Sequence, residues 1–366
     1  MAIDERQSKP TILVVDDDPT NLRFLNEILK EDYQPRIAPS GARALEYLRN
    51  KTPDLILLDV EMPEMDGYEV IRAIKGNPQL KDIPVIFLTG QEGRDKEQEA
   101  LDLGAVDYIL KPISAGIVRK RAGLHIELED YRKSLERAVR LRTAQLRRTQ
   151  DAILNILAST TSYRDSETGQ HVVRTTHYTR AILECLMKKN HPDYQISEEY
   201  AESMIRTAKL HDIGKVSVPD SILLKPARLT MLEFEVMKQH TSFGGQIIDD
   251  AVEDMGEVSP FLVVAREIVT SHHEKWNGLG YPNGLAGSAI PLSGRIMALA
   301  DVYDALISKR PYKSGFTHEK SISIIRQDAG THFDPYLVDL CAEALDEFWH
   351  IAQAYKDKPM SHNYTA

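Results

Sequence analysis

The sequence predicts a multidomain chain: an α/β domain built on a doubly wound parallel sheet, then a long helix, then an all-α domain. Three observations lead to this prediction. The chain has 366 residues, which is more than one ordinary domain needs. Residues 11–121 alternate short apolar runs with helical patterns, whereas residues 151–350 show helical periodicity alone. Residues 122–160, between them, lack proline and are rich in strong helix formers.

Composition and charge exclude several classes of protein. Acidic residues outnumber basic ones by 55 to 45, a formal charge of −10, which disfavours non-specific binding to long nucleic acids. No apolar run reaches the length of a membrane span and the chain starts with polar residues, so we expect no membrane insertion and a cytoplasmic location. The two cysteines, Cys185 and Cys341, show no metal or redox spacing, so no disulfide is expected.

Five apolar runs in the first domain have the length of buried strands: TILVV, YQPRIA, DLILLD, VIFLT and AVDYIL. Helical patterns follow them at residues 19–30, 40–50 and 68–74, in a helix that ends at Leu103, and after the last run. Five strand-then-helix units predict a doubly wound parallel sheet, whose functional groups lie at the carboxyl ends of its strands.

Charged and polar side chains occur at those strand ends. They are Asp16, Asp17, Asp59, Thr89 and Lys111. Carboxylates gathered at one edge of a sheet repel one another unless a divalent cation neutralises them, and such oxygen ligands suit Mg²⁺. Asp18 has a different explanation, because an aspartate directly before Pro19 is a typical start of a helix.

The run DVEMPEMDG at residues 59–67 and the pair Lys111-Pro112 resemble the receiver domain of two-component response regulators, a flavodoxin-like fold. The resemblance covers residues 10–121. It implies that a sensor histidine kinase is the partner and that Asp59 is the phosphoacceptor. The other implied roles are Mg²⁺ binding by Asp16, Asp17 and Asp59, phosphoryl sensing by Thr89 and Lys111, and an aromatic switch at Tyr108.

Residues 122–160 predict a signalling helix. Apolar side chains recur at steps of four and three, at Leu124, Leu128, Tyr131, Leu135 and Ala138. Such a seam is typical of a coiled coil, so we expect a homodimer. The many arginines of this segment alternate with acids, which favours a solvated face over an anion-binding surface.

In the all-α domain, histidines and acids occupy positions that helical periodicity assigns to the interior. Helix starts are indicated at Ser197, at Thr230 with its capping-box partner Glu233, and at Ser259-Pro260. The helix after Thr230 is expected to continue to His240. Six side chains converge on one interior: His211, Asp212, His240, His272, His273 and Asp301.

Burying so many polar groups without partners would cost several kcal/mol each, so a cation is expected among them. Neutral imidazoles and carboxylates without thiolates suit Fe, Mn, Ni or Zn in a catalytic site. His272 and His273 are adjacent at a helix end. Their side chains are expected to point about 100° apart and to serve two metals a few ångström from each other.

Several motifs of this domain resemble the HD-GYP domain, a subclass of the HD-superfamily metal phosphohydrolases. They are LHDIGK at 210–215, HHE at 272–274, GYP at 280–282, RDSETGQH at 164–171, DVYDAL at 301–306, RPYK at 310–313 and HFDP at 332–335. The resemblance covers residues 161–350, and the family degrades cyclic di-GMP. Asn277 and Leu279 depart from residues that relatives often carry, which bears on substrate preference and not on hydrolysis.

The resemblance implies roles for individual residues. The implied metal ligands are Glu167, His171, His211, Asp212, His240, His272, His273 and Asp301. Asp212 would bridge two metals, and Glu167 with His171 would hold a third. The implied substrate-binding residues are Arg310, Lys313 and Tyr281. Lys215 would act with Asp212 in catalysis, although a helix-end lysine that pairs with the helix dipole explains it equally well.

The predicted function is that of a response regulator whose output domain hydrolyses cyclic di-GMP to pGpG, GMP or both. Two or three divalent metals are expected, with Fe ahead of Mn. Phosphorylation of Asp59 is expected to alter Thr89 and Tyr108 and to reorient the helix leading to Glu167. Two alternatives stay open: a catalytically weak cyclic di-GMP sensor or protein-interaction adaptor, and an enzyme for another cyclic dinucleotide or a guanosine alarmone.

Overall fold

The computed structural model describes residues 8–90, 98–99, 101–164, 169–308 and 315–356. The chain divides into two compact units, Met1–Ala144 and Gln145–Ala366. The first is the predicted α/β unit, and the second is helical apart from isolated bridges among its described residues.

The first unit contains a five-stranded parallel sheet in the order β2-β1-β3-β4-β5. Its strands are β1 (Thr11–Val15), β2 (Gln34–Ala38), β3 (Leu55–Asp59), β4 (Val85–Thr89) and β5 (Asp107–Leu110). All five predicted strands are confirmed. Since they run parallel, their carboxyl ends lie along one edge of the sheet.

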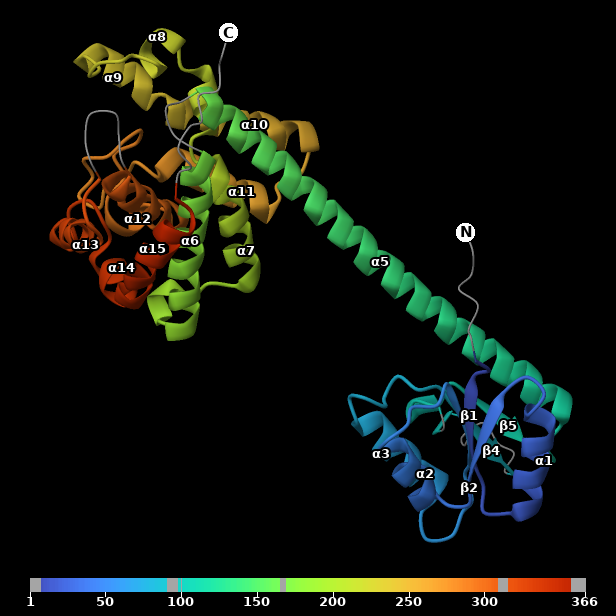
Figure 1. Ribbon diagram of the computed structural model, residues 1–366. Coiled ribbons are helices and arrows are strands. Elements are labelled where there is room, and N and C mark those ends of the chain that lie inside the picture. The colour runs from blue at the N-terminus through green and yellow to red at the C-terminus, as the bar shows by residue number, and fades with distance from the viewer. Residues whose placement is uncertain (1–7, 91–97, 100, 165–168, 309–314, 357–366) are drawn as a thin grey trace, which may run out of the picture. The chain divides into compact units, whose positions relative to one another are not determined.

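Helices cover both faces of this sheet (Figure 1). Alternate strand residues point to opposite sides, so Leu13 and Ile56 pack beneath α2 (Gly41–Leu48) and α3 (Gly67–Gly76). Ile12 and Leu55 face the other way, against α1 (Pro19–Leu29) and the first turns of α5 (Ala115–Arg164). The predicted helix that ends near Leu103 lies only partly in the described residues.

The local helix signals act as the sequence predicts. Asp18 caps α1 by accepting a hydrogen bond from the Thr20 amide at 2.8 Å, directly before Pro19. Thr230 and Glu233 form the predicted capping box, in which each side chain accepts from the other residue's backbone amide. These bonds satisfy amides that the first turn of a helix otherwise leaves without a partner.

The signalling helix is longer than the sequence suggests, because α5 is one continuous helix from Ala115 to Arg164. Val118, Ala122 and Ile126 belong to the buried core of the first unit, so its last helix is also the start of the linker. The seam residues Leu124, Leu128, Tyr131 and Leu135 are exposed in the single chain, Tyr131 by 68%. No helix among the described residues is long and apolar enough to cross a membrane.

The second unit packs its helices around an apolar core. Its longer helices are α6 (Gly169–Lys189), α7 (Glu198–Thr207), α10 (His240–Met255), α11 (Pro260–Ser271), α12 (Leu292–Ile307), α13 (His318–Gln327) and α15 (Ala342–Ala354). The shorter ones are α8 (Asp220–Leu223), α9 (Met231–Lys238), α14 (Pro335–Leu340) and the 3₁₀ turns η1 (Pro192–Tyr194), η2 (Ala208–Leu210), η3 (Ile213–Ser217) and η4 (Gly287–Ala289). Tyr178, Tyr303 and Phe348 join α6, α12 and α15 through ring contacts of 4.5–5.1 Å between centroids.

One predicted helix is wrong in its extent. The helix after Thr230 ends at Lys238, and His240 is the first residue of α10.

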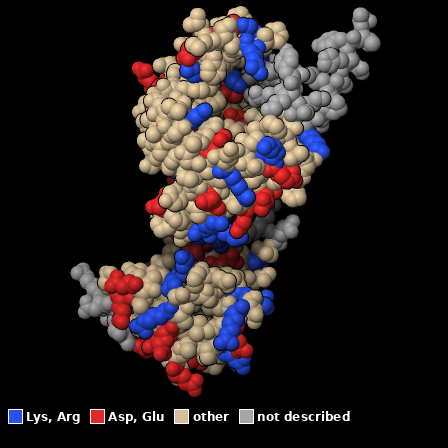
Figure 2. All heavy atoms as spheres, turned by 90° about the vertical axis from the view of Figure 1, so that its left-hand side faces the viewer, with Lys and Arg blue, Asp and Glu red and all other residues tan. Residues whose placement is uncertain are grey.

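On the face drawn in Figure 2, lysine and arginine alternate with aspartate and glutamate over the described residues, so that face carries no extended patch of one charge.

Candidate functional site

The acids of the first unit meet at the carboxyl edge of the sheet. One oxygen from each of Asp16, Asp17 and Asp59 lies within 4.8 Å of the others. Asp16 and Asp59 are buried, and the Lys111 ammonium lies 2.9 Å from Asp59 Oδ1 and 3.3 Å from Asp16 Oδ2. Three carboxylates with one cation leave negative charge uncompensated, so this pocket fits a hard divalent cation.

The aromatic residue expected to act as a switch is tied to the signalling helix. Arg121, on α5, donates to the Tyr108 carbonyl at 2.8 Å, and its guanidinium lies 5.8 Å from the centre of the Tyr108 ring. Arg121 also pairs with Asp107, whose other oxygen lies 3.3 Å from His125 Nε2. Sequence reasoning missed Arg121 and His125, because strand β5 and the helix face that meets it are brought together only by the fold.

In the second unit, three histidines are oriented by one kind of bond. The Nδ1 atoms of His211, His240 and His272 donate to the carbonyls of Ala208, Met237 and Ile268 at 2.8–2.9 Å. A carbonyl can only accept, so Nδ1 carries the proton and Nε2 of the neutral ring has the free lone pair. Each histidine therefore presents Nε2 to the interior, as a metal ligand does.

A first ligand group consists of Asp212, His240, His272 and His273, with one donor atom of each within 4.8 Å of the others. His240 Nε2 lies 3.4 Å from Asp212 Oδ1 and 3.4 Å from His272 Nε2. His272 Nε2 lies 3.8 Å from the same Asp212 oxygen.

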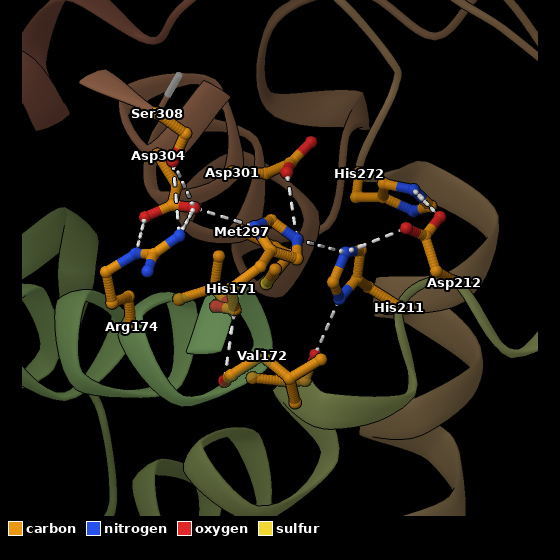
Figure 3. Close-up of polar contacts among 12 residues, drawn as sticks. His171, Val172, Arg174, His211, Asp212, His272, Met297, Asp301, Asp304 and Ser308 are labelled. Carbon is orange, nitrogen blue, oxygen red and sulfur yellow. Dashed lines mark hydrogen bonds and ion pairs between the residues drawn. The ribbon is translucent and has the colours of Figure 1, made fainter. Parts of the chain in front are cut away.

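A second ligand group consists of His171, His211 and Asp212. His211 Nε2 lies 3.2 Å from Asp212 Oδ2 and 3.4 Å from His171 Nε2. Asp301 Oδ1 is 3.6 Å from His171 Nε2. Figure 3 shows Asp212 between His211 and His272, and the Asp301 carboxylate facing the His171 ring.

Asp212 is thus common to both groups, with Oδ1 towards the first and Oδ2 towards the second. A carboxylate in this position is suited to bridge two cations. His272 and His273 are not divided between the groups as the helical angle suggested, since both fall in the first. His272 is the C-cap of α11, so the chain leaves helical geometry at His273 and their rings lie 4.1 Å apart.

Comparisons with known proteins identify both units. A family model for the response regulator receiver domain matches residues 12–122, and one for the HD domain matches residues 153–337. A probable cyclic di-GMP phosphodiesterase of Vibrio cholerae is 44% identical over 361 residues, covering 97% of this chain and 82% of the relative. This chain belongs to the HD-domain response regulators. The receiver and HD-GYP resemblances of the motifs are confirmed.

Two further relatives bear on what members of this family act on. The cyclic di-GMP phosphodiesterase response regulator RpfG of Xanthomonas campestris is 35% identical, covering 90% of this chain and 86% of its own length. A 3'3'-cGAMP-specific phosphodiesterase 2 of Vibrio cholerae is 39% identical over 212 residues, covering 58% of this chain and 38% of its own.

Burial and charge set the protonation of this HD domain's ligand groups. Burial and the neighbouring imidazoles lower the pKa of His272 well below its ordinary value, and burial lowers the pKa of His273 to about 4. Burial alone would raise the pKa of Asp212, but the Lys215 ammonium and His211 hold it well below its usual range. At neutral pH these three groups are therefore in the form that binds cations.

Lys215 faces Asp212 directly, with 2.7 Å between its Nζ and Oδ2. It lines a small pocket at the second ligand group, together with His171 and His211. Ala158, Thr161 and Ser162, from the end of α5, form another wall of that pocket. The signalling helix therefore reaches the ligand groups within the second unit.

Glu274 supports the GYP loop and is not part of a ligand group. Its buried carboxylate accepts hydrogen bonds from the amides of Asn283 and Leu285 at 2.8 and 3.0 Å. A side chain on Gly280 would lie 2.4 Å from the Glu274 Cα, so the loop needs glycine there. The loop places the centre of the Tyr281 ring 4.8 Å from that of the His273 ring. The sequence motif included Glu274, but its role in holding the loop was not predicted.

Three residues with predicted roles, Glu167, Arg310 and Lys313, lie outside the described residues.

Replacing Asp59 by Asn is expected to stabilise the receiver at neutral pH without Mg²⁺. Burial raises the pKa of Asp59 from 3.8 to about 6, so between these values the folded form keeps a proton that the unfolded chain has released. Stability therefore falls as pH rises through that window. Asn removes a penalty on the order of 1–3 kcal/mol. Hydrogen exchange of the β3 amides measures it.

The gain from Asn should shrink at about pH 5 and in saturating Mg²⁺, because a proton or a cation then relieves the same penalty. Lower β3 protection in Asp59→Asn than in the wild type, at neutral pH without Mg²⁺, would contradict the electrostatic explanation.

Gly214→Ala is expected to damage the ligand groups. A Cβ at Gly214 would lie 1.9 Å from the His240 carbonyl oxygen, so η3 and α10 would have to separate. These elements flank Asp212 and carry His240, and such overpacking costs at least about 1–3 kcal/mol. Thermal unfolding and metal content after loading with Mn²⁺ measure the effect. Gly76→Ala is the control, since its Cβ would meet no atom within 4 Å; equal results for both would refute the prediction.

Proposed function

We propose that this protein is a phosphodiesterase that hydrolyses cyclic di-GMP to pGpG and, where a third metal is held, onward to GMP. The observation that carries the proposal is the sharing of Asp212 between two ligand groups, one oxygen in each. The names of its relatives over nearly the whole chain support the choice of substrate.

The donor set fits two divalent cations. Buried imidazoles with lone pairs on Nε2, and a carboxylate held ionised, are the ligands that Fe²⁺ and Mn²⁺ accept, and we propose Fe ahead of Mn. His240, His272 and His273 would hold one cation and His171, His211 and Asp301 the other, with Asp212 between them. Glu167 is proposed to add a third site beside His171. When bound, such cations polarise the phosphoryl oxygens and acidify the attacking water.

The chain's own residues position the substrate around that centre. Lys215, whose Nζ lies 2.7 Å from Asp212 Oδ2, is proposed to balance the charge of Asp212 and to approach a phosphate oxygen of the substrate. Tyr281 offers an aromatic face beside His273 on which a guanine base can stack. Arg310 and Lys313 are proposed to bind the phosphates.

Asp212→Ala is expected to reduce turnover of cyclic di-GMP to background. The loss should exceed the roughly 10–100-fold that follows when a group behind a metal ligand is changed. Protein purified without oxygen is assayed with Fe²⁺ and with Mn²⁺, products are separated by chromatography, and metals are counted. Asp249→Ala, in an exposed pair with Arg266 on the same unit, is the matched control. Unimpaired activity of Asp212→Ala would refute the metal assignment.

The same assay decides between the proposed substrate and its alternatives. Cyclic di-GMP, 3'3'-cGAMP and a guanosine alarmone are compared by kcat/KM, since one relative is named for 3'3'-cGAMP. Preference for cyclic di-GMP supports the proposal. Full metal occupancy and tight nucleotide binding without product would instead make the protein a sensor.

We further propose that a sensor histidine kinase controls this activity through Asp59 and that the chain acts as a homodimer. The proposed Mg²⁺ pocket holds Asp16, Asp17 and Asp59. Thr89 and Lys111 are proposed to sense the phosphoryl group and Tyr108 to respond to it, next to Arg121 of α5. The exposed apolar seam of α5 supports pairing of two chains.

Phosphorylation by a small phosphodonor is expected to change the rate of hydrolysis by about fivefold or more. The reason is that the α5 helix contacts Tyr108 at its start and lines the pocket at the second ligand group near its end. Rates and oligomeric states are measured before and after treatment, with Asp59→Asn as the control that cannot respond. Identical rates and states in the phosphorylated protein and Asp59→Asn would exclude the coupling.

A further inference from the structure

His171 differs from His211, His240 and His272 in what holds its Nδ1 atom. The Nδ1 atoms of His211, His240 and His272 donate to helix carbonyls, whereas His171 Nδ1 lies 2.8 Å from Asp304 Oδ2. His171 is on α6 and Asp304 is on α12, one turn after Asp301. The orientation of His171 therefore depends on a residue of another helix that is far away in the sequence.

Asp304 is itself fixed from the other side. The Arg174 guanidinium forms two parallel hydrogen bonds to it, with Nε 2.6 Å from Oδ1 and Nη2 2.9 Å from Oδ2. Ser308 Oγ lies 3.3 Å from Oδ2, and Arg174 Nη1 donates to the Tyr355 carbonyl at 3.0 Å. Asp304 is 1% exposed and Arg174 is 3% exposed. Figure 3 shows the row Arg174, Asp304, His171 and His211 leading to Asp212.

We propose that Asp304, held by Arg174, is a positioning residue that sets the tautomer and ring direction of His171 and thereby the affinity of the second ligand group for its cation. The inference rests on the proposed function, because it needs the second group to bind a metal. A carboxylate accepts from Nδ1–H, which leaves the lone pair of the neutral ring on Nε2, 3.4 Å from His211 Nε2. The bidentate guanidinium holds the carboxylate in the one plane that suits this bond.

A purely structural role makes a different prediction. The same contacts join α6, α12 and the end of α15, and in a purely structural role the pair would serve stability alone. The second unit contains a comparable buried pair that makes no contact with a described ligand residue, in which Arg295 Nη1 lies 2.7 Å from Asp334 Oδ2 and Tyr194 OH donates to the same oxygen at 2.8 Å. Asp334→Asn is therefore a matched control for the loss of a buried carboxylate.

The experiment counts Mn²⁺ in the full-length protein and measures its affinity and electron paramagnetic resonance spectrum. In the wild type, two adjacent Mn²⁺ ions sharing Asp212 should give an exchange-coupled spectrum. In Asp304→Asn the side chain keeps one oxygen, so it cannot accept hydrogen bonds from both Arg174 and His171 as the carboxylate does. It should bind one ion about 10–100-fold more weakly and show the spectrum of an isolated ion. Asp334→Asn should lower the melting temperature and keep the coupled pair.

Two further variants keep the test decisive. Arg174→Lys retains the positive charge but loses the two parallel hydrogen bonds to Asp304. It should weaken the binding of the same Mn²⁺ ion, and it provides the test if Asp304→Asn does not fold. In a double-mutant cycle, adding Asp304→Asn to His171→Gln should cost little further Mn²⁺ affinity, because both changes act on one ligand. Wild-type metal content, affinity and coupling in both Asp304→Asn and Arg174→Lys would overturn the positioning role alone. A wild-type protein that binds no Mn²⁺ or Fe²⁺ would overturn this role and the proposed function together.

Discussion

The Asp212 carboxylate imposes the main constraint on the second unit, because this one ionised group in the interior needs polar or charged partners at both of its oxygens. Its two oxygens face different sets of imidazoles, and Lys215 supplies the adjacent positive charge. Burying such a charge costs several kcal/mol unless partners surround it. The backbone is shaped accordingly: Gly214 lets η3 touch α10 at the His240 carbonyl, where no side chain would fit. Packing and electrostatics thus meet at the same few residues.

The sequence predicted the elements better than their ends. The five strands and the caps of α1 and α9 follow from apolar runs and from single side chains that bond their neighbours. The end of α9 was missed because Gln239 keeps helical angles, φ −65° and ψ −13°, and no glycine or proline marks the break. The continuity of α5 was missed for the opposite reason: the helix passes through Gly123 without interruption, and the boundary between two units leaves no mark on its residues.

The site was predictable in its residue types and less so in their grouping. Helical periodicity brought His211, His240 and His272 to one interior, and the bonds from Nδ1 to carbonyls three or four residues earlier are local in the sequence. The grouping of His272 with His273 depends on how the chain leaves α11, which helical spacing does not describe. The contact of His171 with Asp304 spans 133 residues and has no local signal. Sequence patterns identify ligands, and the fold determines what holds them.

The α5 helix offers one physical route between the proposed phosphorylation site and the ligand groups. In the first unit, Arg121 and His125 fasten its early turns to β5. In the second unit, Asp151 pairs with Arg206 at 2.8 Å and Asn155 accepts from Lys209 at 2.7 Å, ahead of the pocket wall at Ala158. In the proposed coupling, a rotation imposed at the start of this proline-free helix would be carried to its end. A pair of α5 helices joined through their exposed seams would have few allowed registers. Such discrete states would let a phosphoryl group at Asp59 change the activity by shifting the population between them.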